Sequence, residues 1–232
     1  MRAFAAALAL GFCGLPAQAK DPADTDWPVY NHNYDGQRYS ALTEINAGNV
    51  QSLAPVCSLK IVDAGAFQSG PLVVNGTIYV TAATTTVALD ATNCTERWRS
   101  VYTPEAPVSV PVNRGVAYLD GKLFRGTVDG RLLSLDAATG KVRWKKIVTD
   151  ATKGESLTSA PIAWQGLVFI GTAGGDLGIK GRMMAFDAAT GREVWRFDTI
   201  PTGNETGADS WEVKQAATTG GGGMWSDRKS VV

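Results

Sequence analysis

Between Val73 and Trp195 the sequence runs three times through the same succession of segments. Each copy contains an apolar run, a turn dipeptide, a second apolar run, a strand-like stretch that ends in A/S-x-D, and a tryptophan. The turn glycines of the three copies, Gly76, Gly121 and Gly166, follow one another at intervals of 45 residues. A repeat of roughly 40–45 residues with several short strands is typical of β-propeller blades. We therefore expect an all-β fold, a partial β-propeller with about three to four four-stranded antiparallel blades.

The third copy is longer than the first two. From the turn glycine to the closing tryptophan (Trp98, Trp144 and Trp195) the copies measure 22, 23 and 29 residues. The surplus lies around GGDLGIKG, residues 174–181. Extra residues in one repeat map to a loop on one face, which is often the binding face. This insertion is the first place to look for a functional group.

The start of the chain has the organisation of an export signal. A positively charged beginning is followed by an apolar run over residues 3–15 and by the small-x-small sequence AQA, which ends at Ala19. The apolar run is too short to span a bilayer, and no later segment is apolar enough to cross a membrane. We predict a signal peptide over residues 1–19, cut after Ala19, and a periplasmic or secreted protein over residues 20–232.

The composition excludes one class of partner. The 22 Lys and Arg residues balance the 22 Asp and Glu residues, and they form no basic block or stripe. Nucleic-acid binding is therefore not expected, because it needs a positively charged surface.

Two cysteines remain once the signal is removed. An even number of cysteines in an exported protein favours a disulfide between Cys57 and Cys94, with two buried free thiols as the alternative. Cys57 ends a presumed strand in LAPVCSLK, residues 53–60, and Cys94 lies in the turn before Trp98, so both belong near the first blade. The sequence contains no CxxCH motif, so covalent haem is not expected in this stretch.

The segment before the repeats and the repeat ends resemble a known family. DWPVYNHNYDGQRYS, followed by LTEINAGNVQSL, is similar to the start of mature alcohol dehydrogenases that depend on pyrroloquinoline quinone (PQQ). In that family's tryptophan-docking motif, a glycine follows an alanine by six residues and a tryptophan follows the glycine by four. Ala185, Gly191 and Trp195 match it in full, and the first two copies match at two positions each. The likeness extends from Asp26 to Trp225. We interpret the repeat tryptophans as structural, because each can lie flat on a neighbouring blade.

The resemblance also implies a cofactor pocket. Gln68 stands where the family places a polar contact to the quinone, and Arg114 belongs to an NRG element that supplies an arginine. Thr158 matches a hydroxyl donor to a cofactor carboxylate, and Trp225 matches the ring on which the planar cofactor stacks. Asp176, in the insertion, matches a carboxylate that binds the metal, either calcium or a lanthanide. A guanidinium suits a tricarboxylated quinone, since it pairs with carboxylates and keeps its charge.

Each of these residues has an ordinary explanation when taken alone. Gln68 and Arg114 fit as surface polar groups, Thr158 as a turn hydroxyl, Asp176 as a turn former and the glycines at 220–223 as a flexible linker. Their occurrence together, at matching intervals in matching repeats, favours the cofactor interpretation.

The sequence also departs from the family pattern. Most members carry glutamate at the positions of Gln68 and Asp176, and many have adjacent cysteines where Val108 and Ser109 stand. The family's propeller has eight blades, whereas this sequence holds three clear repeats. The remaining metal ligands and the aspartate that acts as catalytic base would lie in the missing part, so we expect no catalytic base among these residues.

We therefore predict an amino-terminal piece of a periplasmic quinoprotein alcohol dehydrogenase that oxidises a primary alcohol to an aldehyde with PQQ and a metal ion. The implied partners are a small alcohol, a cytochrome c electron acceptor and the remainder of the propeller, and the chain alone is expected to be inactive. The alternatives are a non-catalytic propeller scaffold of the outer-membrane assembly type and a non-functional truncated gene product. Only the first hypothesis needs the five pocket residues.

Overall fold

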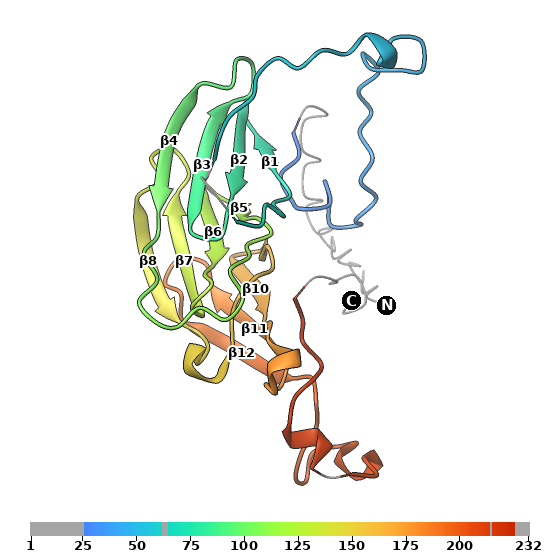
Figure 1. The fold of residues 1–232 in the computed structure, drawn as a ribbon, viewed down its shortest axis with the longest axis vertical. Coiled ribbons are helices and arrows are strands. Elements are labelled where there is room, and N and C mark those ends of the chain that lie inside the picture. The colour runs from blue at the N-terminus through green and yellow to red at the C-terminus, as the bar shows by residue number, and fades with distance from the viewer. Residues whose placement is uncertain (1–25, 62–64, 214, 226–232) are drawn as a thin grey trace, which may run out of the picture.

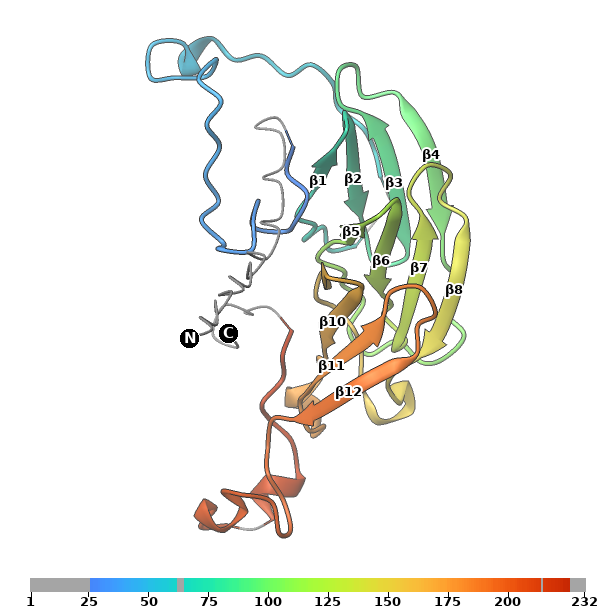
Figure 2. The same cartoon turned by 180° about the vertical axis from the view of Figure 1, so that it is seen from behind.

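The computed structural model describes residues 26–61, 65–213 and 215–225. Within these ranges the chain forms twelve β-strands and five short 3-10 helices, and no α-helix. The strands make separate sheets that follow one another like blades, with β4 and β8 along the outer margin (Figures 1 and 2). The predicted signal peptide over residues 1–19 lies outside the described residues. No helix in the described ranges combines the length and the apolar character that a membrane crossing requires.

Each sheet contains four consecutive strands in antiparallel order. The first sheet consists of β1 to β4 (Leu72–Val74, Thr77–Thr81, Thr85–Asp90 and Glu96–Val101). The second consists of β5 to β8 (Ala117–Leu119, Lys122–Gly126, Arg131–Asp136 and Val142–Ile147). The third consists of β9 to β12 (Ile162–Trp164, Leu167–Gly171, Arg182–Asp187 and Glu193–Asp198). The predicted blades are thus confirmed, and we call these sheets blades 1, 2 and 3. After β12 the described residues contain only turns and the 3-10 helices η4 (Ala208–Ser210) and η5 (Ala216–Thr218).

The repeated turn dipeptides set the register of the first hairpin in each blade. Asn75 and Gly76 have φ angles of 48° and 67°, and the corresponding pairs in blades 2 and 3 also have positive φ. Two-residue hairpins of type I′ need positive φ at both central positions, which Asn-Gly and Asp-Gly tolerate best. The 45-residue spacing of these turns therefore becomes the spacing of the blades.

Apolar side chains fill the space between neighbouring blades on both sides of blade 2. Leu132 and Leu133 are adjacent in β7, yet Leu132 packs in the cluster between blades 2 and 3 and Leu133 in the cluster between blades 1 and 2. Successive side chains of a strand point to opposite faces, so a strand covered on both faces reads as a continuous apolar run. Full burial of one such side chain contributes about 1.5–3 kcal/mol.

Two of the three repeat tryptophans dock on the following blade, as predicted. The indole nitrogen of Trp98 donates to the carbonyl oxygen of Ala137 at 3.0 Å, and that of Trp144 donates to Ala188 at 3.2 Å. Trp195, at the same place in blade 3, is 39% exposed and has no following sheet among the described residues.

The first described residues, 26–34, contact the innermost strands of the blades. Trp27 exchanges two backbone hydrogen bonds with Val73 of β1, at 2.7 and 3.0 Å, and the hydroxyl of Tyr34 donates to the carbonyl of Ala163 in β9 at 2.6 Å. Further along, the chain makes the short 3-10 helix η1 (Val50–Ser52).

The prediction of a strand within residues 53–60 is wrong. No strand is assigned there, although the segment lies against blade 1. It is attached by the predicted disulfide between Cys57 and Cys94, whose Cα atoms are 6.3 Å apart, and by a hydrogen bond of 2.7 Å from Arg99 to the carbonyl of Ile61. A strand needs a partner with which to exchange backbone hydrogen bonds, and these attachments run through side chains instead.

Candidate cofactor pocket

Three of the predicted pocket residues stand just before the innermost strands of the blades. Gln68 and Thr158 lie eight residues before their turn glycines, Gly76 and Gly166, so they occupy equivalent positions in blades 1 and 3. In blade 2, Arg114 lies one residue nearer to its turn glycine, Gly121, than Gln68 and Thr158 lie to theirs. The repeat therefore places these residues at the same end of adjacent inner strands.

Backbone hydrogen bonds link these positions from blade to blade. The N–H of Gly70 donates to the carbonyl of Arg114, and the N–H of Arg114 donates to the carbonyl of Thr158, both at 2.9 Å. The N–H of Met224 donates to the carbonyl of Thr172 at 2.9 Å, just as Leu157 donates to Thr127 one blade earlier. Met224 thus continues the series beyond blade 3, and Trp225 follows it at the position equivalent to Thr158.

Arg114 and Trp225 are in direct contact. The guanidinium carbon of Arg114 lies 4.6 Å from the centroid of the Trp225 ring, which is a cation–π geometry. Burial lowers the pKa of the Arg114 guanidinium from its usual value, although the nearby Tyr30 acts in the opposite direction. One guanidinium nitrogen, Nη1, is buried and has no hydrogen-bond partner among the described residues. The arginine predicted to pair with the cofactor's carboxylates and the ring predicted to stack on the cofactor are therefore in contact with each other.

Thr158 presents a second unpartnered group. It is 1% exposed, and its hydroxyl has no hydrogen-bond partner within the described part of the chain. A buried polar group without a partner costs about 1–3 kcal/mol. A guanidinium nitrogen and a hydroxyl left open on adjacent, hydrogen-bonded segments fit a ligand that carries carboxylate acceptors. The residues present therefore suit the acidic, planar cofactor implied by the sequence.

Asn113 is a pocket residue whose part sequence reasoning missed. Its side chain is buried, donates to the carbonyl of Gly126 at 2.9 Å and accepts from the N–H of Gly115 at 3.0 Å. These bonds fix the loop that carries Arg114. The signal was available, because Asn113 precedes Arg114 in the NRG element.

The insertion folds against the glycine run. Asp176 lies in η3 (Gly175–Leu177), and the glycines on either side of this helix have positive φ. The N–H of Gly181 donates to the carbonyl of Gly221 at 2.8 Å, and the N–H of Gly221 donates to Ile179 at 3.0 Å. A Cβ atom on Gly181 would stand 1.8 Å from the carbonyl oxygen of Gly222, so only glycine fits. The run over residues 220–223 is therefore a packed segment and not a linker.

The metal prediction has less support from this structure. Asp176 is exposed, and no group of three or more His, Cys, Asp or Glu side chains that could hold a metal is found among the described residues. Calcium takes about six to eight oxygen ligands, so one carboxylate does not make a complete site. Gln68 is likewise exposed.

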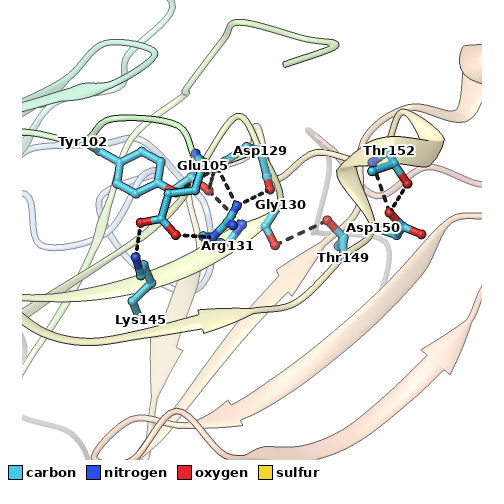
Figure 3. Close-up of polar contacts among 10 residues, drawn as sticks. Tyr102, Glu105, Asp129, Gly130, Arg131, Lys145, Thr149, Asp150 and Thr152 are labelled. Atoms are coloured by element: carbon cyan, nitrogen blue, oxygen red, sulfur yellow. Dashed lines mark hydrogen bonds and ion pairs between the residues drawn. The ribbon is translucent and has the colours of Figure 1, made fainter. Parts of the chain in front are cut away.

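A polar cluster between the β6–β7 turn of blade 2 and the segment that follows β4 of blade 1 was not predicted (Figure 3). Asp129 is 1% exposed and accepts from the hydroxyls of Tyr102 and Thr127, at 2.9 and 2.6 Å, and from the Glu105 N–H at 2.7 Å. Arg131 donates to the same carboxylate at 2.5 Å. The cluster borders a cleft of about 450 Å³, which none of the predicted pocket residues lines.

Comparison with known proteins agrees with this geometry. The PQQ family model, described as "Glucose/ethanol/alcohol dehydrogenase, beta-propeller domain", matches residues 27–230. The chain belongs to this family. The predicted family and the partial PQQ-type propeller are thereby confirmed.

Named relatives of this PQQ-type propeller include two curated alcohol dehydrogenases. Quinohemoprotein alcohol dehydrogenase ADH IIB of Pseudomonas putida is 37% identical over 238 residues, which cover 95% of this chain and 34% of the relative. The lanthanide-dependent methanol dehydrogenase of Methylacidiphilum fumariolicum (strain SolV) is 40% identical over 185 residues, covering 76% of this chain and 30% of the relative.

Solved structures give the same result for the fold. A europium-containing methanol dehydrogenase superposes with a TM-score of 0.79 at 34% identity, covering 88% of this chain and 40% of the other. The quinohemoprotein alcohol dehydrogenase of Comamonas testosteroni superposes with a TM-score of 0.80 at 34% identity, covering 89% and 34%. The PQQ-type propeller described here thus spans about a third of the length of the curated relatives it matches, 34% and 30% for the two named above.

Proposed function

We propose that this chain forms the PQQ-binding part of a periplasmic quinoprotein alcohol dehydrogenase that oxidises a primary alcohol to an aldehyde. The observation that carries the proposal is the contact between Arg114 and Trp225 at 4.6 Å, beside a buried guanidinium nitrogen and a buried Thr158 hydroxyl that lack partners. An aromatic ring, a flat cation and a hydroxyl donor are complementary to a planar molecule that bears carboxylates.

Each pocket residue of this chain would make a different contact with the cofactor. The Trp225 ring, 45% exposed, offers a face for stacking, and Arg114 neutralises carboxylate charge through paired N–H donors. Thr158 donates a hydrogen bond from a position that water does not reach. PQQ, once bound, supplies the two-electron acceptor for alcohol oxidation. Asp176 would contribute one carboxylate oxygen to a calcium or lanthanide ion, whose remaining ligands come from elsewhere.

The activity of a whole enzyme involves more than these residues. We assign the proton acceptor to an aspartate outside the part described here, and we expect a small alcohol as substrate and a cytochrome c as electron acceptor. The names of the relatives support alcohol oxidation, since one is a quinohemoprotein alcohol dehydrogenase and another a methanol dehydrogenase. We expect no nucleic-acid partner, because the balanced charge of the chain supplies no basic surface.

A titration of tryptophan fluorescence with PQQ tests the proposal. The purified chain should show saturable quenching, and Arg114→Ala, Thr158→Val and Trp225→Phe should each weaken binding by about tenfold or more. Arg143→Ala is the matched control, because it removes an exposed arginine that pairs with Asp136 and lies on β8, at the opposite edge of blade 2 from the inner strand that Arg114 precedes. Absence of saturable quenching in the unaltered chain, or equal affinity in all variants, would favour the non-catalytic scaffold.

A further inference from the structure

One side chain connects the insertion with the glycine run. Thr199 follows Asp198, the last residue of β12. Its hydroxyl oxygen lies 2.8 Å from the carbonyl oxygen of Gly181 and 2.7 Å from that of Gly222. A hydroxyl has one proton, so it donates to one of these carbonyls or shares the proton between them. In either case the hydroxyl lies between two loops that are about 40 residues apart in sequence.

The backbone of Thr199 strengthens the same connection. Its N–H donates to the carbonyl of Gly181 at 3.0 Å. The two loops also exchange the hydrogen bonds between Gly181, Gly221 and Ile179 described above. Because glycines have no polar side chains, the hydrogen bonds between these loops come from backbone groups and from Thr199.

The relative position of the two loops matters for the proposed pocket. The insertion carries Asp176, and the glycine run leads directly into Trp225. Their separation decides whether a molecule stacked on the ring also reaches the carboxylate. Misplacement of a binding group by about 1 Å can cost about a hundredfold in the rate of a catalysed reaction.

We propose that Thr199 is a positioning residue, whose hydroxyl holds the Asp176 insertion and the glycine run of residues 220–223 in a fixed relation. The value of this relation for cofactor binding rests on the function proposed above. Thr199 acts through the two carbonyl groups and through the loops that bear them, and it needs no contact with the cofactor.

Hydrogen exchange measured by mass spectrometry tests the connection itself. Thr199→Val keeps the size of the side chain and removes the hydroxyl, so exchange should become several-fold faster in peptides that cover residues 174–181 and 219–225. Thr199→Ser restores the hydroxyl and should restore slow exchange. The control is Thr218→Val, which removes a hydroxyl that bonds only within its own turn, to Gln215 at 2.8 Å. Unchanged exchange of both loops in Thr199→Val would overturn the proposal.

A matched pair of glycine variants gives a second test. Gly222 and Gly203 have nearly identical φ angles of 62° and 63°. A Cβ atom on Gly222 would stand 2.4 Å from the Thr199 hydroxyl, whereas one on Gly203 meets nothing within 4 Å. Both alanine variants therefore carry the same backbone strain, and only Gly222→Ala should accelerate exchange in the insertion. Equal acceleration in both variants would show that contact with Thr199 is not the cause.

A PQQ titration then separates a positioning role from a purely structural one. Thr199→Val should bind PQQ about tenfold more weakly, and Thr199→Ser should bind it within about twofold of the unaltered chain. Loosened loops with unchanged affinity would overturn the positioning role. If the unaltered chain binds no PQQ, the proposed function fails, and the exchange experiments still decide whether Thr199 joins the loops.

Discussion

The indole ring of Trp98 in blade 1 lies on the Cα atom of Gly140 in blade 2, where a Cβ atom would stand 2.5 Å from the ring carbon Cε3. Trp144 and Gly191 repeat the relationship between blades 2 and 3, with a corresponding distance of 2.9 Å. Both glycines have φ near 70°. Glycine is therefore required at this position for two reasons: the backbone is left-handed, and the flat ring leaves no room for a side chain.

Gly140→Ala should destabilise the chain more than Gly121→Ala. The φ angles of the two glycines are 70° and 72°, so the left-handed strain of about 1–2 kcal/mol is common to both. Only at Gly140 would the new methyl overlap a ring, since nothing lies within 4 Å of a Cβ at Gly121. Overlap in a packed interface adds about 1–3 kcal/mol. Urea unfolding measures the difference, and equal losses would mean that the ring does not rest on Gly140.

Trp98→Phe and Trp195→Phe should differ although the two residues are equivalent in the repeat. Trp98→Phe loses the hydrogen bond to Ala137, at a cost of about 0.5–1.5 kcal/mol, while the Tyr79 hydroxyl still donates to that carbonyl at 3.2 Å. The Trp195 indole makes no hydrogen bond to any described residue and is 39% exposed, so its change should cost less. Thermal unfolding of the two variants checks the order, and a larger loss for Trp195→Phe would contradict the docking assignment.

Asp129 should make the chain sensitive to acid. Burial, the largest influence, favours the neutral carboxyl, but hydrogen bonds from Thr127, the Glu105 N–H and Tyr102, together with the charge of Arg131, outweigh it and lower the pKa of Asp129. A lowered pKa in the folded chain means that this stabilisation is complete above the ordinary aspartate value of about 3.9 and is lost as the pH falls below it.

The variant Asp129→Asn should therefore be less stable at neutral pH and should lose less stability between about pH 4 and pH 2 than the unaltered chain. Asp120→Asn, in an exposed hairpin turn, is the control, because asparagine serves a type I′ turn equally well. Denaturant unfolding at a series of pH values gives the comparison. Parallel stability curves for the unaltered chain and Asp129→Asn would refute a role for this carboxylate.

The disulfide should contribute substantially to stability. It joins residues 37 positions apart, for which loss of the cross-link costs about 3–4 kcal/mol. Cys94 has a φ of 61°, so Cys57→Ser/Cys94→Gly should recover about 1 kcal/mol or more relative to Cys57→Ser/Cys94→Ser. Urea unfolding of the oxidised chain and both double variants measures these steps. Identical stability of the two double variants would argue against a left-handed residue at position 94.

The purified chain should bind PQQ without oxidising alcohol. The described residues offer Asp176 as a lone carboxylate at the proposed metal position and no cluster that completes a metal site. Addition of PQQ, calcium or a lanthanide, an alcohol and a dye acceptor should therefore give no alcohol-dependent dye reduction. Dye reduction that Asp176→Ala abolishes would show that the chemistry is carried by residues present here.

The repeat made the blades predictable, because turn dipeptides with positive φ recur at a fixed interval. Contacts between backbone groups leave no repeated pattern in the sequence, because any residue can make them. The packing of residues 174–181 on residues 220–223 could therefore not be predicted. Arg125 is a further example. It is 1% exposed and donates to the Thr86 hydroxyl at 2.7 Å and to the carbonyl of Ala83 at 2.7 Å, in a different blade. Its remaining hydrogen bond goes to the neighbouring carbonyl of Gly126. A buried cation whose partners are neutral oxygens, most of them in another repeat, has no signature in its own segment.

Cys94 occupies in blade 1 the place that Gly140 and Gly191 occupy in blades 2 and 3. A tryptophan that approached blade 1 as Trp98 approaches blade 2 would meet a sulfur atom and the attached segment around Cys57, and not a bare Cα atom. Any tryptophan that docks at this position of blade 1 must therefore rest on the cross-link between Cys57 and Cys94. The docking position of blade 1 is thus built from side chains, whereas those of blades 2 and 3 are built from a bare backbone.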